Sequence, residues 1–576
     1  MLRLFRFLKP YKLALAGVLF LTLLQSLSEL YLPTLMADIV NIGIVGGDNS
    51  YIWKIGGIML LIAAVGVGFS IWASDLSAKI SAGLGRIIRG KLFAHAEKFS
   101  LQEFDRIGTA SMITRTTNDV TQVQMVMMMM LRMMVMAPMM CIGGLVMAIS
   151  KDAKLSLVIA VVIPILVATI FGIAWKGIPL FKVMQTKLDK LNLVLRESLT
   201  GIRVIRSFNR VDYETKRFAE ANRDLTDTAI RANQIMAAMM PAMILVMNFA
   251  SIAIIWFGGL RIEAGGMQVG DLMAFIQYAM QIMFSLVMVS MMFVMLPRAS
   301  ASAVRINEVL DIKPEIEDAV QTKEPAMQRS GHVRFENVTF HYPGAEAPAV
   351  GGISFTAEPG EVTAIIGGTG AGKSTLVSLI PRFYDVGEGR VLIDGMDVRE
   401  MKQETLRAKI GFVPQKAVLF TGTIAENIRY GKEDATEEEL RHAADIAQAT
   451  EFISGMKEGY DSVLAQGGKN VSGGQKQRLS IARALVRRPD IYIFDDSFSA
   501  LDFKTDAKLR AALKPETSEA TVLIVAQRVS TIMDADRIIV LEDGRIAGNG
   551  NHDELMATCE VYREIVLSQL SEEEIA

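Results

Sequence analysis

The chain has 576 residues, of which 51% are hydrophobic, and its formal net charge is −2. This length exceeds that of one domain, and this hydrophobic content predicts that part of the chain lies in lipid. The near-neutral charge argues against nucleic acid as a partner, because a phosphate backbone is normally met by a concentrated excess of Lys and Arg. The two cysteines, Cys141 and Cys559, lie far apart, so neither a disulfide framework nor a cysteine metal site is expected.

The N-terminal twelve residues carry Arg3, Arg6, Lys9 and Lys12 ahead of an apolar run, as a signal peptide does. That run is too long for a signal peptide, and no small-residue cleavage site closes it. We therefore expect a retained first membrane helix.

Six apolar stretches approach the roughly 20 residues that are needed to cross a bilayer core. They are residues 13–36, 55–74, 133–149, 155–175, 237–260 and 272–296. The connections 79–119 and 176–231 are long and rich in Lys and Arg, whereas the other three are short with few basic residues. The positive-inside rule then places both long connections and both termini in the cytoplasm. Helical periodicity predicts that these connections extend the membrane helices into the cytosol.

The composition changes to a soluble α/β pattern after the sixth apolar stretch. We expect a transmembrane domain at 1–312, a linker rich in Glu, Lys and Pro at 313–330, and a second domain at 331–576. β-Branched runs at 362–366, 390–393, 491–494 and 521–525 alternate with helical segments. This alternation indicates a sheet covered by helices.

The strongest local motif is a glycine-rich loop placed between a strand-like run and a helical run. Its residues are Gly367, Gly368, Thr369, Gly370, Ala371, Gly372, Lys373, Ser374 and Thr375. Glycines let backbone N–H groups wrap the phosphates of ATP, the Lys places a cation on the β and γ oxygens, and the Ser hydroxyl ligates Mg²⁺. A glycine-rich turn that merely opens a helix would not require the Lys-Ser-Thr ending.

A buried-strand run at 491–495 ends in Asp495, which suits a carboxylate that holds Mg²⁺ through water beside the nucleotide. Many strands end in Asp, so this assignment depends on what lies upstream. The upstream motif is Ser472, Gly473, Gly474 and Gln475, followed by a helix-forming run. The phosphate loop, this signature and the strand-end Asp, in that order behind six membrane helices, resemble the ABC transporter superfamily. The resemblance is to exporters with fused domains and covers nearly the whole chain.

The resemblance implies that two nucleotide domains sandwich two ATP molecules head to tail. Each ATP would lie between the phosphate loop of one chain and the signature of the other, so a second half-transporter is required. By the same resemblance, Tyr342 stacks on adenine, Gln415 reaches Mg²⁺ and senses the membrane domain, and Asp502 closes the D-loop at 499–502. Residues 114–119 and 197–202 fall where coupling segments of such exporters lie.

Two residues depart from the family pattern. The family normally has a Glu after the strand-end Asp to polarise the attacking water, and this chain has Asp496. Aspartate is one methylene shorter, so its carboxylate should lie about 1.5 Å farther from that water. The expected switch histidine is replaced by Gln527, which cannot become a cation at the γ-phosphate.

Both departures impair the same chemical step, which favours a heterodimer. In this interpretation the chain's own phosphate loop, with Asp495, Asp496 and Gln527, builds a degenerate ATP site, and its signature completes the partner's catalytic site. The whole chain then resembles the degenerate-site subunit of asymmetric bacterial multidrug exporters, located in the plasma membrane. The alternative is that Asp496 and Gln527 are tolerated variants of a working homodimer.

The membrane spans give weaker indications of the cargo. Methionines crowd the third, fifth and sixth spans: 127–130, Met239, Met240, Met243, Met280, Met283, Met288, Met291 and Met292. Flexible, polarizable Met suits a cavity that repacks around varied hydrophobic or amphipathic molecules, but Met also fills helix contacts or faces lipid.

Polar groups within the spans leave two interpretations open. Gln277, Tyr278, Gln281 and Asn248 would hydrogen-bond a substrate or, more commonly, tie helices together. Glu29 would attract cationic drugs or lie in water at the outer end of the first span. A lipid or lipopeptide flippase, a peptide exporter, an importer on the same scaffold and an ATP-binding regulatory subunit remain alternatives to multidrug export.

Overall fold

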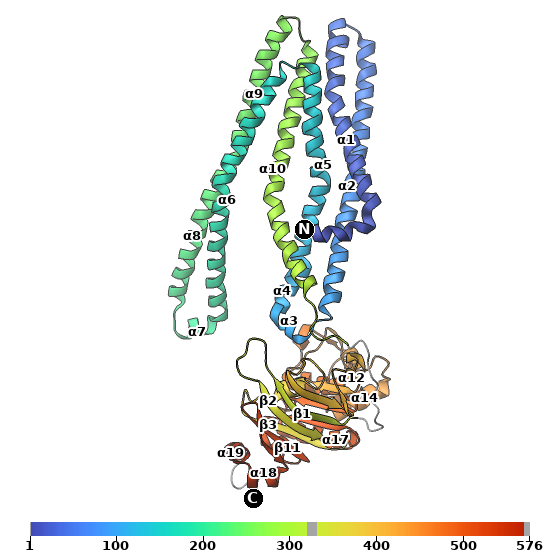
Figure 1. The fold of residues 1–576 in the computed structure, drawn as a ribbon, viewed down its shortest axis with the longest axis vertical. Helices are drawn as coiled ribbons and strands as arrows, with labels where there is room; N and C mark the ends of the chain where they lie inside the picture. Colours follow the sequence, from blue (N-terminus) through green and yellow to red (C-terminus); the bar gives the residue numbers. More distant parts are fainter. Residues whose placement is uncertain (1, 319–330, 570–576) are drawn as a thin grey trace. The chain divides into compact units, whose positions relative to one another are not determined.

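The computed structural model describes residues 2–318 and 331–569 (Figure 1). The chain forms two compact units, of which the first holds residues 1–97 and 108–312. The second unit holds residues 98–107 and 313–576. Residues 319–330 of the predicted linker lie outside the described residues.

Long helices make up the first unit (Figure 1). They are α1 (Lys12–Asp38), α2 (Asn49–Ala96), α5 (Val120–Lys151), α6 (Ser156–Thr200), α8 (Val211–Ala237), α9 (Met239–Glu263) and α10 (Val269–Asp311). Shorter elements are η1 (Leu2–Tyr11), η2 (Ile39–Ile44), α4 (Thr109–Thr114), η3 (Arg115–Asp119) and α7 (Ile202–Ser207). In the described chain, six helical segments are long and apolar enough to cross a membrane, which confirms the six predicted spans.

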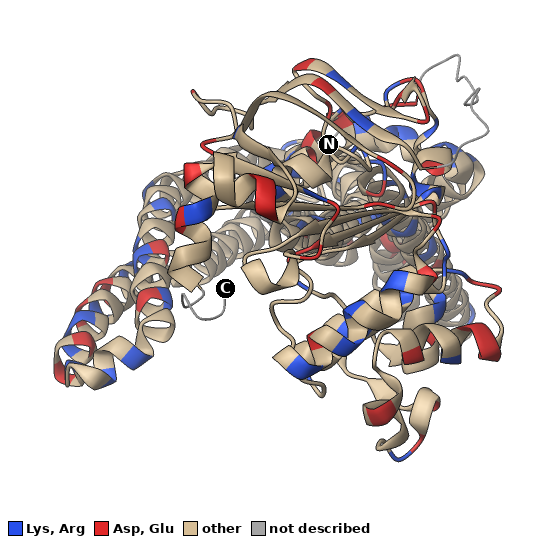
Figure 2. Ribbon diagram, turned by 90° about the horizontal axis from the view of Figure 1, so that it is seen from below, with Lys and Arg blue, Asp and Glu red and all other residues tan. Residues whose placement is uncertain are grey.

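The predicted helical extensions are present as well. Helix α6 continues past its apolar part to Thr200, where it packs against α8. Figure 2 shows residues of both signs along this helix pair, at the left of the view. Lys187 Nζ lies 2.8 Å from Asp224 Oδ2, and Arg217 lies 2.5 Å from Glu197 Oε2. Such charge pairs are typical of helix surfaces in water. Helices α6 and α8 therefore remain helical beyond the apolar part of the segment.

Helices α1, α2, α5 and α10 pack against one another in the first unit. Asp119, which is buried at the start of α5, pairs with Arg305 of α10. The Tyr278 hydroxyl shares a 2.6 Å hydrogen bond with Thr34 Oγ1 and donates to the Leu30 carbonyl at 3.2 Å. Tyr278 therefore ties α10 to α1, which is the commoner of the two predicted uses of this residue.

The structure places the first predicted coupling segment, 114–119, in the first unit. Residues 115–119 form η3, a short π-helical segment that lies within the first unit and leads directly into α5. The chain instead reverses at 97–108, and its helix α3 (Leu101–Ile107) belongs to the second unit. There the buried Glu103 accepts hydrogen bonds from the N–H groups of Ser100 (2.6 Å) and Glu315 (3.0 Å). The second predicted segment, 197–202, does cover a turn, at the junction of α6 and α7.

The second unit is an α/β domain. One sheet has the order β2-β1-β4-β5, with β2 (Val350–Ala357), β1 (Val333–Phe340), β4 (Glu388–Ile393) and β5 (Met396–Asp397). The larger sheet has the order β12-β11-β3-β10-β9-β6, with β12 (Arg545–Gly550), β11 (Arg537–Glu542), β3 (Val362–Gly367), β10 (Thr521–Val525), β9 (Ile491–Asp495) and β6 (Ile410–Val413). A short third sheet pairs β7 (Gly422–Thr423) with β8 (Val463–Leu464). These strands contain the four predicted β-branched runs.

Helices cover the sheets of this unit. They are α11 (Lys373–Ser378), α12 (Gln403–Ala408), α13 (Ile424–Arg429), α14 (Glu437–Ile446), α15 (Thr450–Ser454), α16 (Gly473–Leu485), α17 (Phe503–Glu516), α18 (His552–Thr558) and α19 (Glu560–Gln569). Along β9, Tyr492 and Phe494 join one core cluster, whereas Ile491 and Ile493 join another. Because successive side chains of a strand point to opposite faces, this sheet is buried on both sides. That explains the continuous apolar run in the sequence.

Strands β3, β10, β9 and β6 are parallel neighbours. Val525 of β10 is in register with Asp495 of β9 and with Ile365 of β3. The carboxyl ends of these strands therefore meet at one edge of the sheet, where α/β proteins place their ligand sites. The loops that follow these strands carry the predicted nucleotide residues.

Candidate active site

The phosphate loop follows β3 and ends at the start of α11. Gly372 has a φ of 89°, and a Cβ added to it would lie 2.4 Å from the Ala349 carbonyl oxygen. Gly367 is equally constrained, because its added Cβ would lie 2.1 Å from the Leu541 carbonyl oxygen. Only glycine fits these positions, since L side chains rarely adopt positive φ and the neighbouring backbone leaves no room. Gly367 and Gly372 are therefore required by the packing of the loop.

The two functional side chains of the loop are held by short hydrogen bonds. Lys373 Nζ donates to the carbonyl oxygens of Gly367 and Gly368, each at 2.8 Å. Ser374 Oγ donates to Asp495 Oδ1 at 2.8 Å. Burial lowers the pKa of the Lys373 ammonium, an effect that the nearby carboxylates of Asp496 and Asp495 oppose. A cation, a hydroxyl and a carboxylate thus converge where the loop would cradle phosphates.

Both residues that depart from the family pattern meet in one hydrogen-bonded group. Asp496 Oδ2 accepts from Gln527 Nε2 at 2.8 Å and from Gln415 Nε2 at 3.1 Å. Asp496 follows β9 with a φ of 47°, and its own N–H donates to the Val525 carbonyl at 3.0 Å. The structure therefore brings together Asp496, Gln527 and Gln415, which the sequence places in three separate segments.

The two carboxyl groups at this edge are nearly buried, with 7% of Asp495 and 8% of Asp496 exposed. Burial raises the pKa of Asp495, and the Asp496 charge adds to this effect, while the Ser374 hydrogen bond and Lys373 oppose it. Burial likewise raises the pKa of Asp496 against the hydrogen bonds from Gln415 and Ser499 and the charges of Lys373 and Arg528. Two crowded carboxyl groups favour a bound cation, because it would offset both penalties.

The donor set at this edge suits Mg²⁺. Ser374 Oγ and Asp495 Oδ1 are adjacent, and Gln415 and Asp496 supply further oxygens nearby. Mg²⁺ in nucleotide sites is usually held by one or two carboxylates, water and substrate phosphates. The described residues contain no group of three or more His, Cys, Asp or Glu that could hold a metal ion.

Tyr342 lies beside the phosphate loop. Its hydroxyl shares a 3.0 Å hydrogen bond with Thr375 Oγ1, and its ring packs edge-on against Phe340 and Tyr384. The side chain is 39% exposed, so part of the ring remains free. This position suits a ring that stacks on a base whose phosphates lie in the loop.

The signature motif lies on a different element. Ser472 is the N-cap of α16, and its Oγ accepts from the Gln475 N–H at 3.3 Å while Gln475 Oε1 accepts from the Ser472 N–H at 2.8 Å. The capping box leaves Gly473 and Gly474 in the first turn with their backbone at the helix N-terminus. A glycine-rich helix N-terminus is a natural anion-binding surface.

The D-loop connects Asp496 with the next helix. Ser499 Oγ donates to the Asp496 carbonyl oxygen at 3.0 Å, and Asp502 caps α17 by accepting from the Thr505 N–H at 2.9 Å. These backbone and side-chain hydrogen bonds from Thr505 lower the pKa of Asp502. Asp502 therefore acts as a helix cap, a role that the resemblance alone does not reveal.

Sequence reasoning missed two residues that brace the switch position. Arg528 donates to the carbonyl oxygens of Ser499 (3.1 Å) and Leu501 (3.4 Å). Gln569 Nε2 donates to the Gln527 carbonyl at 2.8 Å, and Gln569 Oε1 accepts from the Val529 N–H at 2.9 Å. Arg528 could have been predicted from the sequence, because it directly follows Gln527. Gln569 could not, because only the folded C-terminal helix brings it to the sheet edge.

The polar and Met side chains of the spans serve mixed purposes. Gln281 Nε2 donates to the Glu29 carbonyl at 3.3 Å, and the Glu29 carboxylate accepts from Gln25 Nε2 at 2.9 Å. Both contacts hold helices or turns together within the unit. Met243 and Met283 are buried in the core of the helical unit, whereas Met240 is 53% exposed. Gln277 and Asn248 are exposed, and the side chains of Met291 and Met292 lie outside the described residues.

Comparison with known proteins gives matches to both units. The family model described as the ABC transporter transmembrane region matches residues 15–286, and the family model described as ABC transporter matches residues 350–499. An uncharacterized ABC transporter ATP-binding protein of Mycobacterium tuberculosis is 45% identical over 565 residues, 98% of this chain and 97% of that one. The uncharacterized ABC transporter ATP-binding protein YfiB of Bacillus subtilis is 41% identical, over 98% of both chains.

Two further similarities concern function and fold. A protein of Mycobacterium bovis described as a fatty acid ABC transporter ATP-binding/permease protein is 35% identical over 466 residues, which are 81% of this chain and 73% of that one. A solved structure of a bacterial Atm1-family ABC exporter with ATP bound superposes with a TM-score of 0.81 at 28% identity, covering 97% of this chain and 98% of that one. The predicted fold, a six-helix membrane bundle fused to an α/β ABC ATPase domain, is thereby confirmed.

Proposed function

Because this chain belongs to the ABC transporter family, with its membrane and ATPase regions fused in one polypeptide, we propose that it is the degenerate-site half of a heterodimeric ATP-driven exporter. Its phosphate loop binds one ATP in a site that cleaves slowly. Its signature helix completes the catalytic site of a second, different half-transporter. The membrane unit lies in the plasma membrane with both termini and the ATPase domain in the cytoplasm.

One observation carries the proposal: the Asp496 carboxylate accepts hydrogen bonds from the amides of both Gln527 and Gln415. A general base must reach the attacking water with a free lone pair, and a neighbouring cation must stabilise the charge that develops on the γ-phosphate. In this chain the carboxylate is one methylene short, one of its oxygens is occupied by two amides, and the switch residue carries no charge. Each feature weakens cleavage, and none affects the phosphate loop with its Lys373 and Ser374.

The binding groups support retention of nucleotide. Lys373, Ser374 and Asp495 lie within hydrogen-bond reach of their loop partners, and Tyr342 is anchored to Thr375. Bound Mg²⁺, held by Ser374 and Asp495 with Gln415 nearby, would neutralise phosphate charge. Gly367, Gly368, Thr369, Gly370, Ala371, Gly372 and Thr375 form the rest of the loop. The cofactors of the proposed site are therefore ATP and Mg²⁺.

The proposed cargo is a hydrophobic or amphipathic compound that moves outward. Methionines in the core of the helical unit, such as Met243 and Met283, can repack around varied apolar shapes. The similarity to a fatty acid transporter of Mycobacterium bovis favours amphiphiles with a charged head within this class. A lipid flippase is the second candidate, because fold does not settle cargo.

The test measures ATP turnover by the purified full chain in nanodiscs, alone and after addition of candidate partner half-transporters. We expect slow turnover alone and a large increase with the correct partner, whose own phosphate-loop Lys is needed for it. Lys373→Ala in this chain should abolish nucleotide binding at its own site while leaving most of the turnover of the pair. Fast turnover by the isolated chain that Lys373→Ala abolishes would instead establish a working homodimer. ATP binding without transport by any pair would indicate a regulatory subunit.

A further inference from the structure

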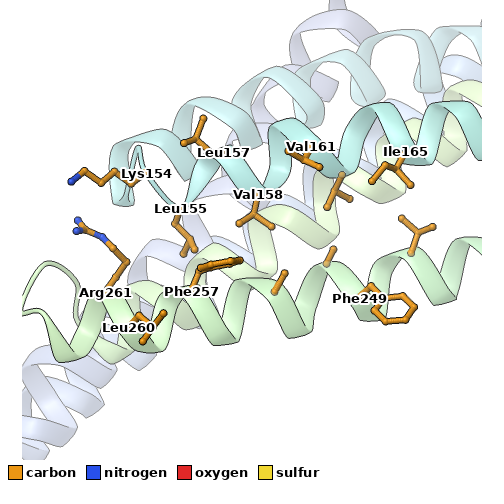
Figure 3. Close-up of a pocket in the computed structure, with 14 residues that line it drawn as sticks. Lys154, Leu155, Leu157, Val158, Val161, Ile165, Phe249, Phe257, Leu260 and Arg261 are labelled. Atoms are coloured by element: carbon orange, nitrogen blue, oxygen red, sulfur yellow. The ribbon is translucent and has the colours of Figure 1, made fainter.

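Two cavities of the described chain differ in their walls. In the membrane unit, an apolar groove lies between α6 and α9, with Lys154 and Arg261 at one end of it (Figure 3). Nothing in the described chain shows what covers these apolar walls, so no ligand is assigned to the groove. In the ATPase unit, a pocket of about 1150 Å³ is lined mainly by charged and polar residues. The walls of this second pocket indicate the chemistry of a ligand.

The charged pocket lies at the edge of the larger sheet that is opposite the phosphate loop. Its residues Glu361, Asp490 and Ala520 directly precede β3, β9 and β10. Because these strands are parallel, their amino ends meet at one edge of the sheet, and their carboxyl ends, with Lys373 and Asp495, meet at the other. The ATP site proposed above is completed by a partner at the carboxyl edge, so its completion leaves the pocket uncovered.

Backbone hydrogen bonds join the three segments that form the walls of the pocket. The Gly360 N–H donates to the Ala520 carbonyl at 3.0 Å. The Thr521 N–H donates to the Asp490 carbonyl, also at 3.0 Å. Three further lining residues are prolines, whose rings restrict the backbone: Pro359, Pro489 and Pro515. The pocket is therefore formed before a ligand binds, which lowers the entropy that binding costs.

Carboxylates dominate the charge of this pocket. Its lining contains the guanidinium of Arg488 and five carboxylates, which belong to Glu358, Glu361, Asp490, Glu516 and Glu519. Basic neighbours neutralise only part of this charge: Asp490 lies 3.0 Å from a lysine, and histidines lie 3.2 Å from Glu358 and 3.1 Å from Glu516. Glu361 and Glu519 have no ion pair among the described residues. The pocket therefore favours a cationic ligand.

Two groups in the pocket lack the hydrogen bonds that buried polar groups normally make. Glu361 Oε2 is buried and has no hydrogen-bond partner in the described chain. Tyr492 is only 2% exposed and its ring packs parallel to that of Phe494, yet the side chain lines the pocket, and its hydroxyl has no hydrogen bond to a described residue. Burial and the Glu516 charge, opposed by Arg488, raise the pKa of Tyr492 to about 12, so the hydroxyl stays neutral. Both groups can accept an N–H donor from a ligand.

The arrangement of the carboxylates and the size of the pocket narrow the class of ligand. Nowhere in the described chain do three His, Cys, Asp or Glu side chains form a group that could hold a metal ion, so these carboxylates call for several separate cations. The volume of about 1150 Å³ also exceeds the roughly 300–1,000 Å³ of pockets for drug-sized molecules. Arginine and lysine side chains along one peptide supply separate cations, and their aliphatic stems can pack on the prolines.

We infer that this pocket binds an arginine- or lysine-rich peptide segment of another protein, whose cationic side chains donate to Glu361 Oε2 and to the Tyr492 hydroxyl. Arginine suits Glu361 best, because a guanidinium is more weakly hydrated than an ammonium and is more easily buried. Glu519 and the other carboxylates meet further cations of the same segment. The inference goes beyond the proposed function, because it concerns the opposite edge of the sheet and does not depend on how fast the ATP site cleaves.

The test measures fluorescence anisotropy of a fluorescein-labelled hexapeptide of alternating arginine and glycine, added to the full chain in phosphatidylcholine nanodiscs at about 0.15 M salt. We expect saturable binding. Glu361→Gln and Tyr492→Phe should each raise the Kd about tenfold, because each removes an acceptor for a charged N–H group. The same peptide with citrulline in place of arginine keeps the shape without the charge, and should bind about tenfold more weakly or less.

Three matched variants serve as controls, and none of them changes a residue that lines the pocket. Glu438→Gln removes an exposed carboxylate of α14, Tyr430→Phe removes an exposed hydroxyl, and Asp495→Asn removes a buried carboxyl group at the opposite edge. All three should bind the peptide like the unaltered chain. Glu519→Gln lies on the exposed part of the pocket and should also weaken binding, so the test does not depend on the two buried variants alone. Thermal unfolding shows that each variant is folded.

Four results would overturn the inference. Equal binding of the arginine and citrulline peptides would show that charge is not recognised. Equal losses in Glu361→Gln and Glu438→Gln would show a diffuse attraction to the acidic surface. A loss in Asp495→Asn would place the peptide at the nucleotide edge. Displacement of the peptide by an equal concentration of spermidine would assign the pocket to a free polyamine.

Discussion

The phosphate-loop edge of the sheet and the signature helix α16 both carry residues predicted to bind nucleotide. They differ in the hydrogen bonds that their side chains make. At the edge, Lys373, Ser374 and Asp496 all hydrogen-bond to groups of the same unit. On α16, the side chains of Ser472 and Gln475 bond to each other's backbone N–H groups in a capping box at the helix N-terminus. In the proposed function, nucleotide binding, cleavage and completion of a partner's site depend on separate residues, so one can change without the others.

The largest expected effect comes from restoring the family pattern at the edge. Asp496→Glu together with Gln527→His should raise single-turnover ATP hydrolysis at this chain's own site by about 10²-fold or more, because a positioned general base contributes roughly 10²–10⁴ in rate. Rapid-quench measurements on the complete transporter would show it. Asp543→Glu is a suitable control, because Asp543 has a φ of 46°, like the 47° of Asp496, but lies in the turn between β11 and β12. No increase in the double variant would mean that some other feature limits cleavage.

The next effect concerns how firmly the edge holds ATP. Tyr342→Ala should weaken ATP binding by about 1–3 kcal/mol, or about 5- to 150-fold in Kd, because base–aromatic stacking contributes about that much. Tyr342→Phe keeps the ring and loses only the hydrogen bond to Thr375, so its loss should be at most about 1.5 kcal/mol. Equilibrium binding of a fluorescent ATP analogue compares the two. Equal losses in both variants would show that the hydroxyl, not the ring, matters.

A pH-dependent effect should separate the crowded carboxyl groups from ordinary surface acids. The pKa of Asp495 is raised from 3.8 in the folded chain, so its ionisation at neutral pH destabilises the nucleotide-free fold. Asp495→Asn removes this charge and should unfold at a higher temperature than the unaltered chain at pH 7. The difference should shrink as the pH falls through the raised pKa toward 3.8, because both states then carry the proton. Thermal unfolding without nucleotide or Mg²⁺, followed across pH, measures it, and a difference that does not depend on pH would contradict burial of the Asp495 charge as its cause.

The smallest expected effect distinguishes the signature from an ordinary helix cap. Ser472→Ala should lower the free energy of unfolding by about 1 kcal/mol through loss of the N-cap, and should leave ATP affinity at this chain's own site unchanged. Thr436→Ala removes the same kind of capping box from α14 and should cost about as much stability. Only Ser472→Ala should also slow hydrolysis by the heterodimer. If the two variants slowed hydrolysis equally, the signature would be acting through stability alone.

Much of the fold followed from local sequence patterns. Six apolar stretches, each about long enough as a helix to cross a bilayer core, predict six spans. Continuous β-branched runs such as 491–494 predict strands that are buried on both faces. The phosphate loop was also predicted from the sequence, because its glycines and its Lys-Ser-Thr ending form one short, continuous motif. These features depend on neighbouring residues, so the sequence displays them directly.

The assignment of residues 98–107 to a unit shows what such patterns do not contain. Helical periodicity continues across 98–119, and nothing in it marks where the chain leaves one unit for the other. The structure assigns 98–107 to the ATPase unit because Glu103 is buried there and accepts the Glu315 N–H. The contact between Glu103 and Glu315 joins residues more than 200 positions apart. Local periodicity cannot predict a contact between residues so distant in sequence.

The sequence by itself determined the elements of this protein, their order and the chemical identity of the phosphate-binding residues, because each depends on spacing along the chain. Tertiary structure alone decided that one carboxylate oxygen of Asp496 receives both Gln415 and Gln527, and that Gln569 returns from the C-terminus to brace the switch turn. It also decided that Lys154 lies at the mouth of an apolar groove. The reason is physical: hydrogen bonds and charge balance depend on distances in space, and packing sets those distances between segments that are remote in sequence.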